Sequence, residues 1–91
     1  MKRTDILAYA SLYRDYIRND MEDTDGNDYE TRSKLLARMY GVESLNNLDK
    51  KTYLRKVEPF TSMVRILADC NVSDDKIIAV LKLLDWGHIE D

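Results

Sequence analysis

The stretch FTSMVRILADCNVSDDKIIAVLKLL, residues 60–84, decides the fold class of this 91-residue chain. Its hydrophobic residues recur every three or four positions in two segments, which is the period of an α-helix. Between the segments, Asn71 and Val72 predict a tight turn, and Ser73 is a residue type that favours the position before a helix. The stretch therefore predicts two consecutive helices, one ending near Cys70 and the next beginning after Ser73.

Two more helices are predicted in the first half of the chain. Hydrophobic residues from 4 to 21 fall on one side of a helix, and Thr4 or Asp5 is placed to accept a hydrogen bond from its free amides. A loop with Gly26 and clustered Asp and Asn follows, and the next helix is predicted over residues 27–40. Gly41 then suits the left-handed conformation that ends many helices.

The middle of the chain predicts a further helix that Asp49 caps and that ends at Val57. Pro59 then predicts a boundary, because the residue before proline avoids helical geometry, and it suits the first turn of the next helix. Residues 42–48 fit either a turn or a single helical turn. Together these patterns predict an all-α fold, a compact single-domain bundle of about five short helices over residues 1–91.

Composition supports a helical globular protein in a reducing compartment. Hydrophobic residues make up 44% of the chain, and three Gly and one Pro are too few for the many turns of a sandwich or barrel. The lone Cys70 excludes an internal disulfide. No apolar run approaches the length of a membrane span. We therefore expect a cytoplasmic location and no membrane contact.

Charge divides the chain into three blocks. Residues 1–30 hold four Lys/Arg against eight Asp/Glu, residues 31–57 hold seven against two, and residues 58–91 hold three against seven. The local net charges are −4, +5 and −4 within a total of −3. Two interpretations stay open at this point: a charged recognition surface in the middle, or a fold that neutralises its own blocks.

The basic block contains a candidate charged recognition patch, made of cations with helical spacing on two predicted helices. If the two helix faces align, these cations form one surface that suits phosphates or an acidic protein. As the alternative function, the basic segment 32–56 predicts a small helix-turn-helix-like regulator that binds nucleic acid. This basic patch consists of Lys34, Arg38, Lys51, Arg55 and Lys56.

The last two helices also have the outline of a helix-turn-helix, but their charge opposes DNA binding. A recognition helix contacts DNA mainly through its N-terminal residues, which here include Asp74 and Asp75. The last helix is also too apolar for a simple surface helix. We expect it to lie at the centre of the bundle or to meet a partner, with Ile78, Leu83 and Trp86 as candidate partner-binding residues.

Tyrosines form a stripe on the first predicted helix. Tyr9, Tyr13 and Tyr16 recur with helical spacing and could stack on the bases of a single-stranded nucleic acid. Tyrosines in this pattern more often pack in the core and extend their hydroxyl groups to its rim. We favour the core interpretation.

Little in the sequence points to metal binding or catalysis. His88 is the only histidine and Cys70 the only cysteine, so a zinc site with several such ligands is not available. The Asp-rich turn at 23–28 does not match a calcium loop, because the twelfth position from Asp23 is Lys34 rather than a glutamate. Nucleophilic catalysis needs a positioned base beside the nucleophile, and no such pattern is visible. We expect no enzyme activity, no catalytic residue, no metal and no cofactor.

The leading functional prediction is a small non-catalytic protein-binding module. It would act as a regulator, adaptor or inhibitor of a larger protein partner, of the kind common in phages and mobile elements. Opposed charge blocks can steer association with a charged partner. A homo-oligomer is a second use of the apolar last helix, because a domain this small gains from burying more apolar surface.

Overall fold

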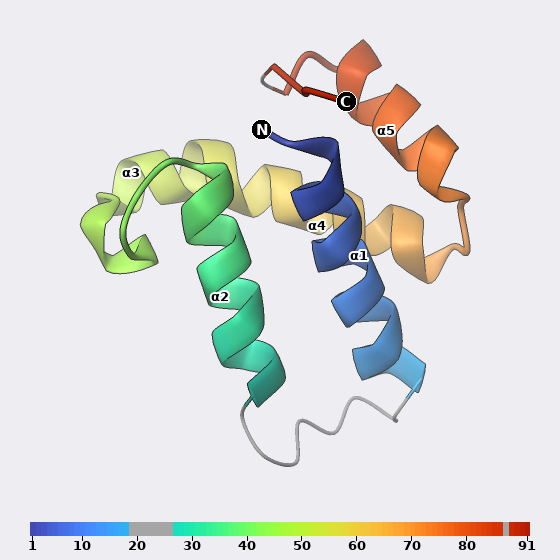
Figure 1. Cartoon of the computed structure of the whole chain (residues 1–91). Helices are drawn as coiled ribbons and strands as arrows, with labels where there is room; N and C mark the ends of the chain where they lie inside the picture. Colours follow the sequence, from blue (N-terminus) through green and yellow to red (C-terminus); the bar gives the residue numbers. More distant parts are fainter. Residues whose placement is uncertain (19–26, 87) are drawn as a thin grey trace.

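The described part of the chain folds into four helices and contains no extended strand (Figure 1). The computed structural model describes residues 1–18, 27–86 and 88–91, with all of their side chains except those of 16–18 and 27–29. The all-α fold predicted from the sequence is confirmed. The elements are α1 (Arg3–Arg18), α2 (Asn27–Met39), the 3-10 turn η1 (Leu45–Asn47), α3 (Lys50–Thr52), the π-helical segment η2 (Tyr53–Val57), α4 (Glu58–Asp69) and α5 (Asp74–Leu83).

The predicted third and fourth helices form one continuous helix, so the expected number of five helices is wrong. α3, η2 and α4 follow one another without a break from Lys50 to Asp69. Pro59 has no amide to donate, and its ring would crowd a carbonyl of the preceding turn in a regular α-helix. The Glu58 amide instead donates to the Tyr53 carbonyl five residues earlier, which is the wider π-helical turn. The helix can pass through Pro59 because the turn before it is widened.

α1 lies between α2 and α5 in Figure 1 and crosses the long helix formed by α3, η2 and α4. It packs against both α2 and α4, whereas α5 packs against α4. α5 therefore lies at one side of the bundle rather than at its centre, contrary to one of the two expectations for it. None of the helices in the described part of the chain has the length and apolar character that crossing a membrane requires.

One hydrophobic core joins all four helices. Phe60 is fully buried, and its ring makes edge-to-face contacts with Tyr40 at 6.2 Å and with Trp86 at 6.3 Å between ring centroids. The buried cluster comprises Ile6, Tyr9, Ala10, Leu36, Met39, Phe60, Val64, Ala68, Ile77, Ile78, Leu81 and Ile89. The helical period of residues 60–70 predicts that Phe60, Val64 and Ile66 face inward. Phe60 and Val64 do so, whereas Ile66 is 57% exposed.

Caps and turns follow the predicted residue types in most places. The Asp49 carboxylate accepts hydrogen bonds from the amide of Thr52 at 2.7 Å and from its hydroxyl at 3.0 Å, and these bonds lower the pKa of Asp49. Gly41 has a φ of +66°, as predicted for the residue that ends α2. Ser73 occupies the N-cap position of α5, but its side chain makes no capping hydrogen bond.

The start of α1 differs from its prediction because the end of the chain supplies its cap. The helix begins at Arg3, whose amide donates to the Glu90 carbonyl at 2.8 Å. The Glu90 amide in turn donates to the Met1 carbonyl at 2.7 Å, so the two terminal segments pair side by side. The prediction that Thr4 or Asp5 caps this helix is therefore wrong.

Two isoleucines test how far the core determines stability. Replacing the fully buried Ile77 by valine is expected to lower the free energy of unfolding by about 0.5–1.5 kcal/mol, because it removes a packed methylene group. The same change at the exposed Ile66 should have almost no effect. Urea unfolding of both variants measures the difference. Equal losses for Ile77→Val and Ile66→Val would contradict the assignment of the core.

Candidate functional site

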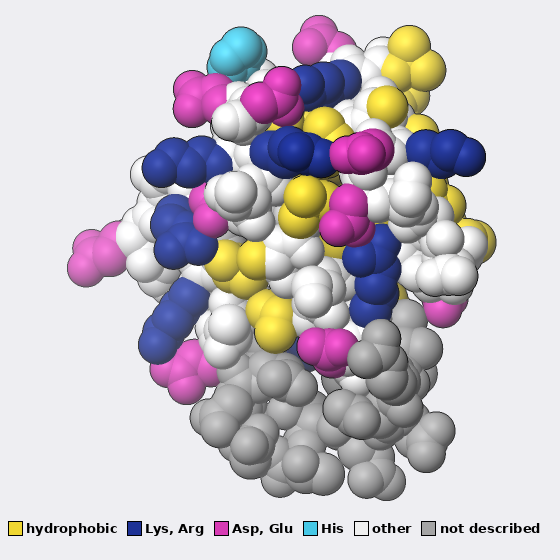
Figure 2. Space-filling view, turned by 45° about the vertical axis from the view of Figure 1, so that its right-hand side comes forward, with side chains coloured by type: hydrophobic (Ala, Val, Ile, Leu, Met, Phe, Trp, Pro, Cys, Tyr) yellow, Lys and Arg dark blue, Asp and Glu magenta, His cyan; other side chains and the backbone are white. Residues whose placement is uncertain are grey.

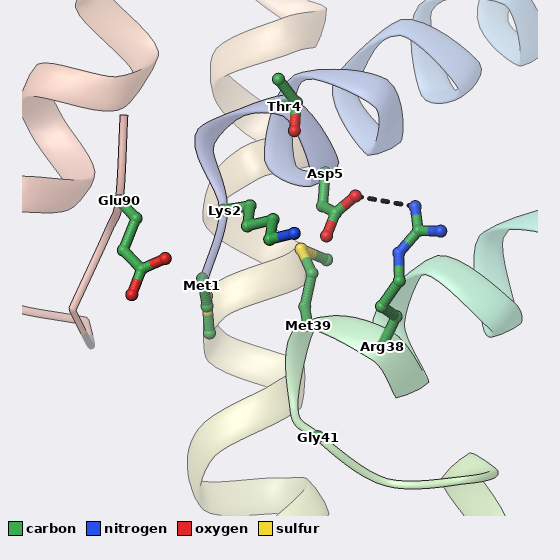
Figure 3. A pocket seen from close by; sticks show the side chains of 8 residues that line it. All are labelled: Met1, Lys2, Thr4, Asp5, Arg38, Met39, Gly41 and Glu90. Carbon is green, nitrogen blue, oxygen red and sulfur yellow. Dashed lines mark hydrogen bonds and ion pairs between the residues drawn. The ribbon is translucent and has the colours of Figure 1, made fainter.

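An ion pair connects the basic middle of the chain to its acidic first third. Arg38 on α2 donates to the buried Asp5 on α1 at 2.7 Å, within a cleft of about 430 Å³ beside the chain termini (Figure 3). On the same helix Lys34 pairs with Glu30 one turn earlier at 3.0 Å. Two of the five members of the basic patch are therefore already engaged with carboxylates of the protein itself.

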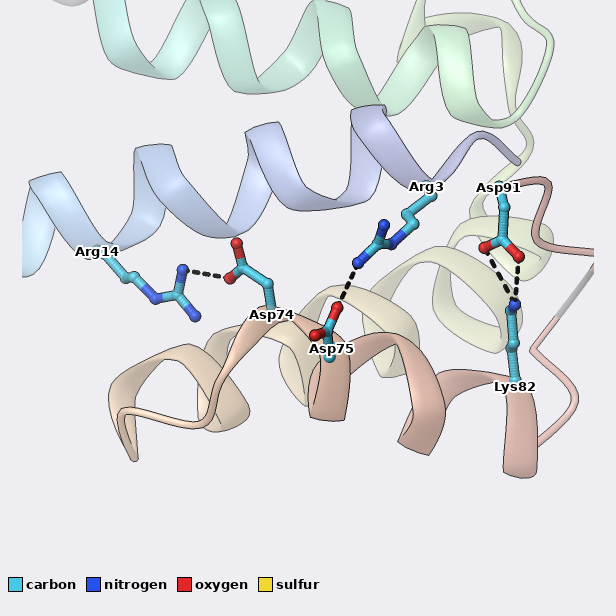
Figure 4. A network of polar contacts seen from close by, with 6 residues as sticks. All are labelled: Arg3, Arg14, Asp74, Asp75, Lys82 and Asp91. Carbon is cyan, nitrogen blue, oxygen red and sulfur yellow. Dashed lines mark hydrogen bonds and ion pairs between the residues drawn. The ribbon is translucent and has the colours of Figure 1, made fainter.

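A second set of ion pairs connects α1 to the acidic start of α5 (Figure 4). Arg14 donates to Asp74 at 2.8 Å and to the Val72 carbonyl at 2.9 Å, and Arg3 donates to Asp75 at 2.5 Å. The acidic first turn of α5 thus faces cations of the same chain. Together with the contact between Arg38 and Asp5, these pairs support the interpretation that the fold neutralises part of its own charge pattern.

The other three members of the basic patch lie on the long helix and are exposed. Lys51 belongs to α3, and Arg55 and Lys56 belong to η2. None of the three forms an ion pair within the part of the chain that the structure describes. Figure 2 shows one face of the molecule, on which cations and carboxylates are interspersed rather than separated. Of the five predicted patch residues, Lys51, Arg55 and Lys56 thus remain exposed without an ion pair to a described residue, and we call these three the exposed basic segment.

The three predicted partner-binding residues have different environments in the structure. Ile78 is only 4% exposed and belongs to the core, so it offers a partner little surface. Leu83 is 84% exposed, and its neighbour Leu84 is 48% exposed. Trp86 is half-buried against Phe60 and keeps part of its ring at the surface. We call Leu83, Leu84 and Trp86 the α5 end surface.

Helix geometry explains the difference between Ile78 and Leu83. The buried side chains of α5 are Ile77, Ile78 and Leu81. Leu83 follows Leu81 by two residues, which places it about 200° further round the helix and therefore on the opposite side. A sequence in which nearly every side of the helix is apolar does not reveal which side the bundle covers.

A third surface, which sequence reasoning missed, lies between α1, α2 and the long helix. This cleft of about 270 Å³ brings tyrosines and arginines together, and we call it the tyrosine-arginine cleft. The Arg65 guanidinium lies 5.7 Å from the centre of the Tyr13 ring, and its Nε donates to the Thr61 carbonyl at 3.4 Å. The lining residues are Tyr9, Tyr13, Arg32, Ser33, Leu36, Leu45, Tyr53, Thr61 and Arg65.

The tyrosine stripe is the only sequence signal that points to this cleft. Tyr9 is buried, as favoured, and it lines the cleft together with Tyr13, whereas the side chain of Tyr16 lies outside the described part. Burial raises the pKa of Tyr9, and the positive charges of Arg65 and Arg32 oppose that rise. These arginines come from two other helices, so their meeting with the stripe depends on the tertiary fold.

The described residues contain no cluster suited to a metal ion. No group of three or more His, Cys, Asp or Glu side chains among them could hold one. Cys70 and His88 are both exposed. The Asp-rich turn at 23–28 lies outside the residues whose side chains are described, so the structure does not test its predicted failure to bind calcium.

No known protein family, curated protein or solved structure matches this chain. Its function must therefore be argued from the chemistry of its own surface. Three features are available for that argument: the α5 end surface, the exposed basic segment and the tyrosine-arginine cleft.

The phenol of Tyr40 provides a test of the packing around Phe60. Its hydroxyl donates to the Lys56 carbonyl at 3.0 Å, and burial raises the pKa of Tyr40 to about 12. Between pH 10 and 12 the unfolded chain loses this proton while the folded chain keeps it, so stability falls as the pH rises. We expect Tyr40→Phe to make this fall shallower, measured by urea unfolding at pH 9, 10 and 11.

The matched control for this measurement is Tyr53→Phe, which changes a more exposed tyrosine in the same way. At neutral pH, Tyr40→Phe should cost about 0.5–1.5 kcal/mol through the lost hydrogen bond. The same pH slope in the wild type and in Tyr40→Phe would show that the phenol is not buried as described.

Proposed function

We propose that this protein is a small non-catalytic protein-binding module, a regulator, adaptor or inhibitor of a larger partner, and that its contact surface includes the α5 end surface. The observation that carries the proposal is the exposure of Leu83 and Leu84 next to the partly buried Trp86. The exposed free Cys70 supports a cytoplasmic location, since free thiols persist in reducing compartments.

The α5 end surface has the composition of a small binding site. A single exposed leucine is ordinary on a protein surface, but here two exposed leucines are adjacent in the sequence and are followed two residues later by a partly exposed tryptophan. Burying a fully exposed leucine side chain against a partner stabilises a complex by about 1.5–3 kcal/mol. Lys82 and Asp85 flank the leucines in the sequence and are exposed, which supplies the polar rim that usually surrounds an apolar contact.

A substitution at Leu83 tests this proposal without disturbing the core. We expect Leu83→Ser to reduce capture of a protein partner from native lysate about tenfold or more, because it removes the most exposed apolar side chain. Helix content and thermal stability should stay at the wild-type values, since Leu83 is 84% exposed. Capture should survive nuclease treatment.

Ile66→Ser is the matched control, because Ile66 is exposed on another helix. It should capture the same partner as the wild type. Size-exclusion chromatography with light scattering applies the same pair of variants to self-association. If Leu83→Ser captures the same proteins as the wild type and has the same oligomeric state, the α5 end surface is not a binding site.

The exposed basic segment favours a second candidate function, nucleic-acid binding. Lys51, Arg55 and Lys56 carry three cations on neighbouring turns that no carboxylate of the described chain neutralises. Exposed Tyr53 lies within the same segment, and an aromatic ring beside cations suits the stacking of a base. The ion pairs of Lys34 and Arg38 weaken the contribution of α2 to this surface.

The salt dependence of binding tests this second candidate. If the segment grips phosphates, the double variant Lys51→Ala and Arg55→Ala should weaken binding to DNA or RNA and reduce the slope of log K against log salt by about 2. The matched control is Lys2→Ala with Lys76→Ala, which makes the same change in net charge at exposed positions elsewhere. An unchanged slope in the first variant, or an equal change in both, would contradict the assignment.

A further inference from the structure

The exposed large hydrophobic side chains of the described chain gather in two places. Leu83 and Leu84 belong to the α5 end surface, and Tyr53 and Leu54 lie in the sequence between the cations of the exposed basic segment. Among the residues that the structure describes, Ile66 alone is a large exposed hydrophobic residue outside these two stretches. Exposed apolar side chains with charged groups around them are typical of contacts between proteins. Both stretches are therefore candidates for contact, and their charges differ.

The charge that remains unpaired beside the α5 end surface is negative. Lys82 pairs with both carboxylate oxygens of Asp91 at 3.1 Å, so the lysine that precedes the leucines is neutralised (Figure 4). Asp85 directly follows the leucines and is exposed, and its carboxylate forms no hydrogen bond or ion pair with a described residue. A partner that covers Leu83 and Leu84 therefore brings its own groups close to an unpaired carboxylate.

The exposed basic segment has the opposite charge and the same kind of apolar contact. Its three cations and the neighbouring Lys50 are exposed and form no ion pair with a described residue. Lys51 precedes Leu54 by three residues and Arg55 by four, a spacing that makes side chains neighbours on the surface of a helix. The segment therefore combines an exposed leucine with unpaired cations.

The two surfaces do not meet within one chain. α3 and α5 lie on opposite sides of the start of α1 in Figure 1, and no ion pair between described residues joins the basic segment to the end of α5. Residues 50–56 contain four Lys/Arg and no Asp/Glu, whereas residues 83–91 contain three Asp/Glu and no Lys/Arg. Each surface is therefore complementary in charge to the other surface of a second copy.

We propose that the exposed basic segment of one copy docks on the α5 end surface of a second copy. Leu54 packs against Leu83 and Leu84, and Asp85 pairs with Arg55. Because the two surfaces differ, the contact is head-to-tail, and it closes into a dimer or a ring or extends into a chain.

This contact also regulates the binding site of the proposed function. The inference rests on that function in one respect, that the α5 end surface is a binding site. A second copy and a larger protein partner then occupy the same surface and exclude one another. Self-association at high concentration therefore lowers the amount of protein that is open to the partner.

The mass of the wild-type protein tests the contact directly. The full chain is treated with nuclease and measured by size-exclusion chromatography with light scattering, over a dilution series at low and at high salt. We expect a mass above that of the monomer that falls on dilution, since two small surfaces give a weak contact. High salt should favour the monomer, because it screens the unlike charges.

Two variants that each break one surface separate this contact from a symmetric one. Lys51→Glu with Arg55→Glu breaks the basic segment, and Leu83→Ser breaks the α5 end surface. Each variant alone should have a dissociation constant for self-association about tenfold or more above that of the wild type. An equimolar mixture of the two variants should form a 1:1 complex, because one intact surface of each kind remains.

The matched control is Lys2→Glu with Lys76→Glu. It makes the same change in net charge at exposed positions outside both surfaces, and it should associate as the wild type does. Circular dichroism checks that all variants keep the helix content of the wild type.

The wild-type protein alone can overturn the proposal, so a variant that fails to fold does not protect it. A protein that is monomeric at every concentration has no such contact, and an association that nuclease abolishes means that nucleic acid bridges the copies. Two results with folded variants would also overturn it. One is loss of association in Leu83→Ser but not in the basic variant, which indicates a symmetric contact between α5 end surfaces. The other is a mixture that does not associate.

Failure of this inference can be distinguished from failure of the proposed function. The variant Lys51→Glu with Arg55→Glu keeps its own α5 end surface, so it should capture a larger protein partner at least as well as the wild type. Leu83→Ser should capture less in the same experiment. A monomeric wild type with this capture result would remove the head-to-tail contact and leave the proposed function in place.

Discussion

The burial of Phe60 is the contact on which the rest of the arrangement depends. Its ring meets Tyr40 at the end of α2 and Trp86 beyond the end of α5, so one side chain of the long helix joins segments that are far apart in the sequence. A domain of this size has a small core, so one large buried side chain makes up a considerable part of it. The widened turn at η2 lies directly before α4, and a continuous helix carries both Phe60 and the exposed basic segment. The residues proposed to bind nucleic acid and a central core residue therefore lie on the same helix.

Part of the charge pattern along the sequence is neutralised within the molecule. Arg38 on α2 pairs with Asp5 on α1, and Arg3 on α1 pairs with Asp75 on α5. Such partly exposed pairs contribute little stability individually, about 0–1 kcal/mol each. These pairs also neutralise cations that would otherwise add to the positive charge of the surface. What remains exposed of the predicted basic patch is a smaller basic segment on the long helix.

Local patterns in the sequence were sufficient to predict that helices form. They were insufficient to predict all of the helix boundaries and which side of each helix is exposed. Helical periodicity predicted the helices that carry the core residues Ile6 and Val64, and the residue type alone identified Asp49 as a cap. The helix boundary predicted at Pro59 is absent, because the π-helical turn before it accommodates a residue that has no amide to donate. No residue pattern in the sequence indicates that such a turn forms. Ile78 was predicted to bind a partner but is buried in the core. The sequence of an almost wholly apolar helix does not show which of its sides the bundle covers. The tyrosine-arginine cleft could not be predicted, since its residues meet only after three helices have packed.

The pairing of the chain termini also determines the order in which the molecule can be completed. The amide of Arg3 finds its acceptor in the Glu90 carbonyl, and Ile89 enters the core beside it. During synthesis on the ribosome α1 emerges early, but the Arg3 amide cannot meet this acceptor until residue 90 has been added. This end of the bundle therefore closes later than the contacts between α1 and α2, which need only the first half of the sequence.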